Sequence, residues 1–131
     1  MTAQHHRHQE GSSLLEALVA ILIFSIGIVA LMGLQAASLK NVADSKFRAD
    51  ASFLANQLVG QMWTDIPNYK DGKYADAGYD KRKEWDSVVT ATLPAASTKV
   101  DMNGTIATIV ISWRAAGQDA HSYKTTVNIV E

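Results

Sequence analysis

The chain lacks cysteine, so neither a disulfide framework nor a thiolate metal site can form. Histidine is scarce as well. Only His121 lies beyond the first eight residues, so a histidine-based metal cluster or a catalytic triad is hard to build. No glycine loop of the phosphate-binding type is present, and Asp71, Asp76 and Asp80 lack the spacing of a calcium loop. We therefore expect no enzyme activity, no metal and no cofactor.

Charge of either sign is nearly absent from the first third of the chain. The 131 residues include 12 basic and 13 acidic side chains, and the formal net charge of −1 gives no electrostatic preference for nucleic acid. Only Arg7, Glu10 and Glu16 precede Lys40. The one basic cluster, residues 81–83, is typical of a solvated helix face rather than a DNA site. The chain thus divides into a polar leader, a long apolar stretch and a charge-balanced polar domain.

The apolar stretch covers residues 17–34, which read ALVAILIFSIGIVALMGL. As a helix it would span roughly 27 Å, close to the ~30 Å hydrocarbon core of a bilayer. A buried core helix normally keeps a polar stripe, whereas this segment is apolar on every face. It is also longer than the apolar region of a secretory signal peptide, and helix-forming residues follow Leu34 in place of a signal-peptidase site in a turn-forming context. The sequence predicts a membrane anchor that stays in the mature protein, in a segment we place at residues 12–39.

The charges beside the apolar stretch leave its orientation open. Arg7 is the only lysine or arginine before it, whereas Lys40, Lys46 and Arg48 follow it. Counting these residues favours the second flank as cytoplasmic. That count conflicts with the orientation implied by the resemblance described next.

Residues 11–16 read Gly-Ser-Ser-Leu-Leu-Glu and lie directly between the polar leader and the apolar stretch. This arrangement resembles the prepilin signal of type IV pilins and pseudopilins, in which a dedicated cytoplasmic peptidase cuts after a glycine. The resemblance implies cleavage between Gly11 and Ser12, removal of residues 1–11, and methylation of the new amine of Ser12. Phe or Met is usual at that position in the family. Glu16 falls at the fifth mature position, where the family has glutamate.

Glu16 stands at the start of the apolar stretch, where an isolated carboxylate is costly unless it reaches the headgroups. In a filament it could pair with the free amine of Ser12 in a neighbouring subunit. Two opposite charges about 4 Å apart attract by roughly 4 kcal/mol at an effective dielectric near 20. Desolvation offsets much of that attraction, so the pair would chiefly set the register of packing.

Beyond the membrane segment, the pattern predicts an amphipathic helix over residues 40–63, with helical structure continuous from Leu14 to Trp63. One apolar stripe recurs at helical spacing and is sized to cover a small sheet: Phe47, Ala51, Leu54, Leu58 and Met62. The helix should end at Ile66-Pro67-Asn68.

Residues 64–80 are predicted to form a surface loop, because they are rich in glycine, aspartate and tyrosine. The resemblance implies subunit contacts for Tyr69, Tyr74 and Tyr79, and plain packing within the loop explains them equally well. A short helix should follow over residues 81–93, with Trp85, Val88 and Val89 facing inward.

The tail, residues 97–131, reads as a three-stranded antiparallel sheet. Its inward positions alternate with polar ones, and the expected inward set is Thr98, Val100, Met102, Ala107, Ile109, Ile111, Trp113, Tyr123, Thr125, Val127 and Ile129. A hairpin turn is expected at Asn103-Gly104, which also explains the Asn-Gly-Thr glycosylation sequon. His121 is expected in a loop.

The sequence therefore predicts an α+β fold of type IV pilin-like architecture, a long N-terminal helix packed on a small antiparallel sheet. Residues 11–62 look most like minor pilins of the PilV class. That resemblance implies a single-pass inner-membrane protein with residues 40–131 in the periplasm, later built into a pilus at the cell surface. It also implies partners: the prepilin peptidase, the inner-membrane assembly platform, other minor and major pilins, and a tip adhesin.

The role implied is pilus initiation or tip formation, serving adhesion, twitching motility or DNA uptake. Two other interpretations stay open. One is a minor pseudopilin of type II secretion, which carries the same signal and helix. The other is a bitopic anchor with a periplasmic binding domain.

Overall fold

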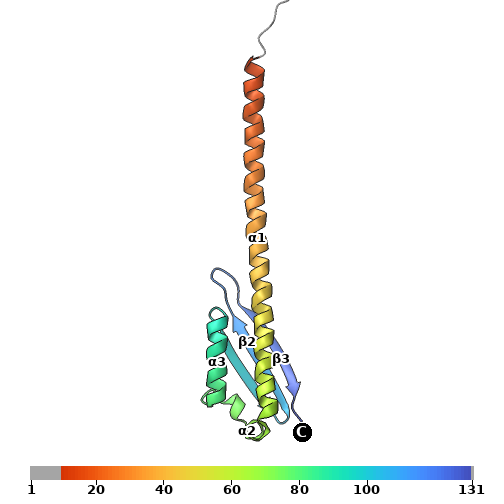
Figure 1. The fold of residues 1–131 in the computed structure, drawn as a ribbon, viewed down its shortest axis with the longest axis vertical. Coiled ribbons are helices and arrows are strands. Elements are labelled where there is room, and N and C mark those ends of the chain that lie inside the picture. The colour runs from red at the N-terminus through yellow and green to blue at the C-terminus, as the bar shows by residue number, and fades with distance from the viewer. Residues whose placement is uncertain (1–9, 131) are drawn as a thin grey trace, which may run out of the picture. The chain divides into compact units, whose positions relative to one another are not determined.

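A computed structural model describes residues 10–130 of the chain (Figure 1). Most of the expected leader, including His5, His6 and His8, lies outside the described residues. The elements in order are α1 (Glu10–Thr64), α2 (Ile66–Lys70), the 3-10 helix η1 (Lys73–Ala75), α3 (Asp80–Thr92), β1 (Ser97–Asn103), β2 (Ile106–Trp113) and β3 (His121–Asn128). The chain divides into two compact units, residues 1–42 and residues 43–131.

In the first unit, the described residues are helical throughout and belong to α1. Helix α1 begins at Glu10, four residues before the predicted start at Leu14. The prediction was too short because no proline interrupts residues 10–13. The helix continues through Gly11 and the two serines, although serine is a favoured N-cap residue. Every side chain of residues 12–42 is exposed, including all the large apolar ones.

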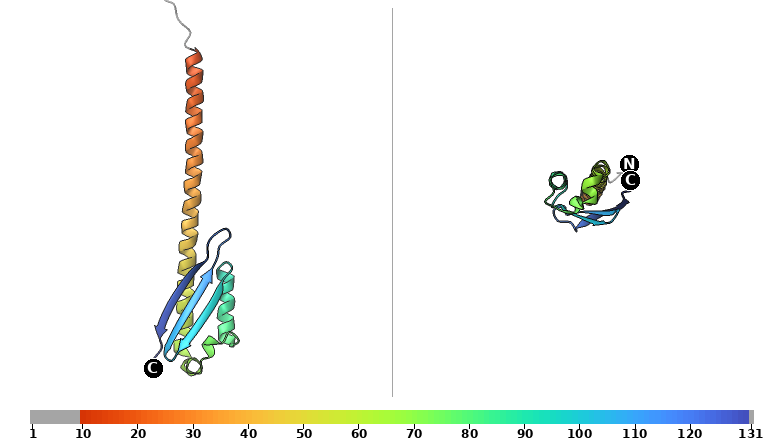
Figure 2. Two further views of the ribbon diagram at one scale, coloured as in Figure 1. Left: turned by 180° about the vertical axis from the view of Figure 1, so that it is seen from behind. Right: turned by 90° about the horizontal axis from the view of Figure 1, so that it is seen from below.

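The second unit is a two-layer α+β structure. Helices α1 and α3 lie on one face of an antiparallel sheet with strand order β1-β2-β3 (Figure 2). This confirms the predicted fold class. Strand β2 is central, and its side chains alternate between buried and half-buried or exposed positions.

The strand faces match the predicted alternation, whereas the first turn differs by one residue. Asn103 pairs with Ile106, so Gly104 and Thr105 form the two-residue turn rather than Asn103 and Gly104. Gly104 has a φ of 60°, which suits glycine at the first central position of a type II′ turn. Because glycine rather than asparagine takes the positive φ, the turn begins one residue later than the Asn-Gly pattern indicates.

The core lies between the helices and the sheet. The predicted stripe on α1 is confirmed: Phe47 packs against the core from its edge, and Ala51, Leu54, Leu58 and Met62 are buried. On α3, Trp85 and Val89 are buried as predicted, whereas the prediction for Val88 was wrong. Val88 is 42% exposed, because the inward face of this helix is completed one turn earlier by Arg82.

The segment predicted as a surface loop, residues 64–80, instead contains α2 and η1. Pro67 lies in the first turn of α2, where its missing N–H and fixed φ are compatible with a helix. Tyr69 and Tyr74 are 2% and 0% exposed and belong to the core. Their burial contradicts the expected subunit contacts at these two positions and supports packing within the segment. Tyr79 is half-buried, and its ring packs edge to face with that of Tyr74, with the two ring centres 5.3 Å apart.

Candidate functional site

The first turns of α1 carry the residues singled out by the sequence for processing and assembly. Gly11, Ser12 and Glu16 all lie in this helix, and the side chains of Ser12 and Glu16 are exposed. Residues four apart in a helix share one face. The structure therefore places the serine whose amine would be released and the glutamate on the same side of α1.

The residues that follow present an unbroken apolar surface. The large apolar side chains between Leu14 and Leu34 are 38–69% exposed, with Ile28 at the lower end and Phe24 and Leu34 at the upper end. Nothing in the first unit covers these side chains. By length and composition, α1 is the one helix in the described part of the chain that could cross a membrane.

A family model, the prokaryotic N-terminal methylation motif, matches residues 6–32. This methylation motif covers Gly11, Ser12 and Glu16 together with most of the apolar stretch. It supports a type IV pilin-like or pseudopilin protein anchored in the inner membrane, and it implies processing by a prepilin peptidase and assembly with other pilins. Type IV pilins are structural rather than enzymatic proteins. No curated protein and no solved structure matches this chain.

A second group of polar side chains surrounds Asp65, where α1 gives way to α2. The carboxylate accepts hydrogen bonds from Lys81 Nζ at 2.7 Å, Asn68 Nδ2 at 2.6 Å and the hydroxyls of Tyr79 and Tyr74 at 2.9 and 3.1 Å. Lys81 and the other donors hold the pKa of Asp65 well below its usual value, against the opposing effect of partial burial. Burial and the bond to Asp65 raise the pKa of Tyr74. The cluster ties α3 and η1 to the end of α1.

We expect the Asp65 cluster to make stability depend on pH below about 4. Because folding lowers the pKa of Asp65, its contribution is complete above the unfolded value of 3.8 and is lost as the pH falls toward the folded value. The Tm of the wild type should therefore exceed that of Asp65→Asn at pH 7, and the difference should shrink between pH 4 and pH 2. Asp71→Asn, an exposed change nearby, should show no such convergence. A pH-independent gap between wild type and Asp65→Asn would contradict the expectation.

Arg82 is the centre of a further polar network and is 2% exposed. Its guanidinium donates to the carbonyl of Tyr74 at 3.0 Å, to Thr98 Oγ1 at 3.0 Å and to Asp86 Oδ1 at 3.1 Å. It also lies 5.3 Å from the ring centre of Trp85. The prediction of a solvated face for residues 81–83 was therefore wrong at Arg82, because its three donors find partners on η1, β1 and α3.

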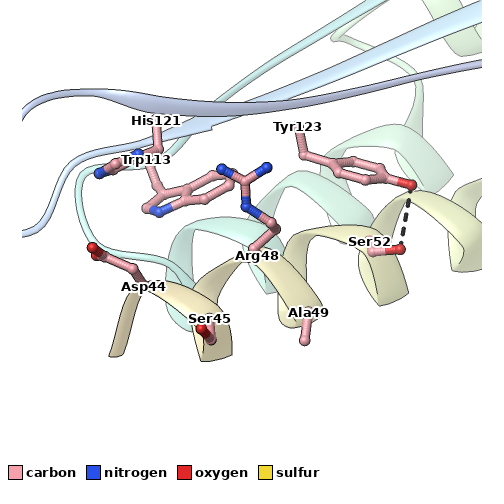
Figure 3. A pocket seen from close by; sticks show the side chains of 8 residues that line it. All are labelled: Asp44, Ser45, Arg48, Ala49, Ser52, Trp113, His121 and Tyr123. Atoms are coloured by element: carbon pink, nitrogen blue, oxygen red, sulfur yellow. Dashed lines mark hydrogen bonds between the residues drawn. The ribbon is translucent and has the colours of Figure 1, made fainter. Parts of the chain in front are cut away.

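A cleft of about 540 Å³ opens between α1 and the ends of β2 and β3 (Figure 3). Asp44, Arg48 and Ser52 line it from α1, and Trp113, His121 and Tyr123 line it from the sheet. His121 begins β3 rather than lying in a loop, and its ring stacks on Trp113 with centres 6.0 Å apart. At the other end of the cleft, Ser52 on α1 donates a hydrogen bond of 3.3 Å to the hydroxyl of Tyr123 on β3 (Figure 3).

The sequence did not indicate the Asp65 cluster or the cleft. One sequence feature could have indicated the Asp65 cluster: an aspartate directly before Ile66-Pro67, which is a favoured residue at the N-cap of a helix. No local pattern marks the cleft, because its walls come from residues about 70 apart in the chain. Among the described residues, no group of three or more histidine, aspartate or glutamate side chains could hold a metal ion.

Proposed function

We propose that this chain is a minor pilin of the type IV pilus. The observation that carries the proposal is the methylation motif at residues 6–32, at the head of a helix whose later part packs on a three-stranded sheet. An exposed apolar segment on a folded polar domain suits a subunit that is stored in a membrane and then packed among other helices. The domain of residues 40–131 would face the periplasm before assembly.

Within this proposal, the peptidase cuts between Gly11 and Ser12, and the new amine of Ser12 is methylated. Glu16 then pairs with the amine of a neighbouring subunit, which sets the register of the packed helices. A minor subunit of the PilV class would act at the pilus tip or in the priming complex, with other minor and major pilins, the assembly platform and a tip adhesin. Its role would be to promote assembly and thereby adhesion or twitching motility.

Mass spectrometry of the protein purified from its host membranes tests the proposed processing. We expect a chain that begins at Ser12 and carries one added methyl group. The same protein from cells without an active prepilin peptidase should keep residues 1–11 and serves as the control. Retention of residues 1–11 in the presence of the active peptidase would contradict the proposal and favour a bitopic anchor with a binding domain.

The methylation motif equally supports a minor pseudopilin of type II secretion. Deleting the gene separates the two functions. Loss of surface pili with normal export of secreted enzymes supports the minor pilin. Normal piliation with the enzymes retained in the periplasm supports the pseudopilin.

A further inference from the structure

The cleft between α1 and the sheet holds two charged side chains of opposite sign that do not neutralise each other. Asp44 and Arg48 are four residues apart on α1, the spacing and order at which a helix forms an ion pair. Within the described part of the chain, neither forms an ion pair or side-chain hydrogen bond. In Figure 3, the carboxylate of Asp44 points to one end of the cleft, and Arg48 extends toward the sheet. The cleft therefore offers one acceptor and one cationic donor at separate points.

Two buried polar atoms on the walls also lack partners. Trp113 is 2% exposed, and its indole N–H forms no hydrogen bond. Asp44 Oδ1 is likewise buried without a donor. Buried polar groups are nearly always hydrogen-bonded, since an unpaired one forfeits its hydration. A donor and an acceptor left unpaired in the same cleft indicate a bound group that both accepts and donates.

The charges and the donors define that group more closely. A guanidinium binds a carboxylate or phosphate through two parallel hydrogen bonds, so Arg48 suits an anionic group. The carboxylate of Asp44 suits an ammonium group. His121 and Tyr123 are half-buried, and their rings line the cleft from the sheet. Because Asp44 and Arg48 cancel in charge, the complementary ligand carries both charges and is neutral overall.

We propose that this cleft binds a small zwitterion, an ammonium and an acidic group on one short skeleton. This is the chemistry of a free α-amino acid, and a phosphoethanolamine headgroup shares it with phosphate in place of carboxylate. The anion lies against Arg48, and the ammonium lies against Asp44. The volume of about 540 Å³ accommodates a ligand of this size with room for a side chain.

Isothermal titration of the full chain in an uncharged detergent tests the proposal, since a zwitterionic detergent would compete. The probes are glycine, a panel of L-amino acids and phosphoethanolamine, with acetate and methylamine as the two halves of glycine. We expect at least one zwitterion to bind about tenfold or more tightly than acetate or methylamine. Preference for an amino acid over phosphoethanolamine identifies a free metabolite as the source, and the reverse identifies a lipid headgroup. Equal affinity for a zwitterion and its halves, or no binding of any probe, overturns the proposal.

Charge-matched variants locate the binding. Arg48→Gln and Asp44→Asn should each lower the affinity for the preferred probe by about tenfold or more, because each removes a charge-assisted contact. Lys46→Gln and Asp50→Asn make the same charge changes on the same helix without lining the cleft, and they should leave affinity within about twofold. Near-UV circular dichroism checks that all four variants keep the wild-type fold. If the two control variants lose as much affinity as the two cleft variants, the proposed site is wrong.

Discussion

Replacing Glu16 with glutamine is expected to lower incorporation of the chain into filaments by about tenfold or more. The change keeps the size of the side chain and removes its charge, so the amine of the neighbouring Ser12 would be left without a counter-charge in a water-poor helix bundle. Removing one partner of a buried ion pair typically costs about 3–5 kcal/mol, and each 1.4 kcal/mol is tenfold in an equilibrium. Immunoblotting of sheared pili against the membrane fraction measures incorporation.

Glu10→Gln is the matched control, since it makes the same change within the segment that processing removes. It should leave incorporation at the wild-type level. Both variants should still be cut after Gly11, which mass spectrometry of the membrane-bound pool verifies. If Glu16→Gln enters filaments as well as the wild type, the proposed charge pair is wrong.

Trp85→Ala should destabilise the folded domain by about 3–5 kcal/mol. Trp85 is 2% exposed between α3 and α1, and its indole N–H donates a hydrogen bond of 2.8 Å to the carbonyl of Leu54. Its ring also lies beside the buried guanidinium of Arg82. Truncation therefore leaves a cavity and removes a polar contact together. Urea unfolding of the full chain in detergent, followed by near-UV circular dichroism, measures the loss.

Trp63→Ala is the matched control, because it removes the same side chain from a position that is 43% exposed. It should change the free energy of unfolding by no more than about 0.5 kcal/mol. Trp85→Phe keeps most of the apolar volume and isolates the hydrogen bond to Leu54, with an expected cost of about 0.5–1.5 kcal/mol from the bond itself. Similar losses for Trp63→Ala and Trp85→Ala would contradict the burial described for Trp85.

Much of the second unit follows from patterns that repeat along one element. The alternation in β2 placed Ala107, Ile109 and Ile111 in the core, because successive side chains of a strand point to opposite faces. The stripe from Ala51 to Met62 on α1 was predictable for the same reason, at the helical period. The turn at Gly104 was missed by one residue, since Asn-Gly fits more than one turn type and the strand register decides between them.

The errors concentrate where an aromatic or charged side chain is buried by partners distant in sequence. Tyr69 and Tyr74 lie in a segment of loop-like composition, yet α2 and η1 fold under the end of α1 and bury both rings. Arg82 was predicted to be solvated because lysines flank it in the sequence. Its guanidinium can be buried because it donates hydrogen bonds to Thr98 and to the carbonyl of Tyr74 in the folded domain. Composition describes the neighbours in sequence, and these burials depend on neighbours in space.

By itself, the sequence determined the apolar segment, the glycine–serine junction with its glutamate, the helix stripe and the alternation of the strands. Each of these is a short-range pattern that can be interpreted from a single helix or strand and the water or lipid around it. Only the tertiary structure decided that Asp65 gathers four donors and that Asp44, Arg48 and Trp113 line one cleft. Such groups form when α1, α3 and the sheet pack together, because packing brings side chains from separate elements within hydrogen-bonding distance.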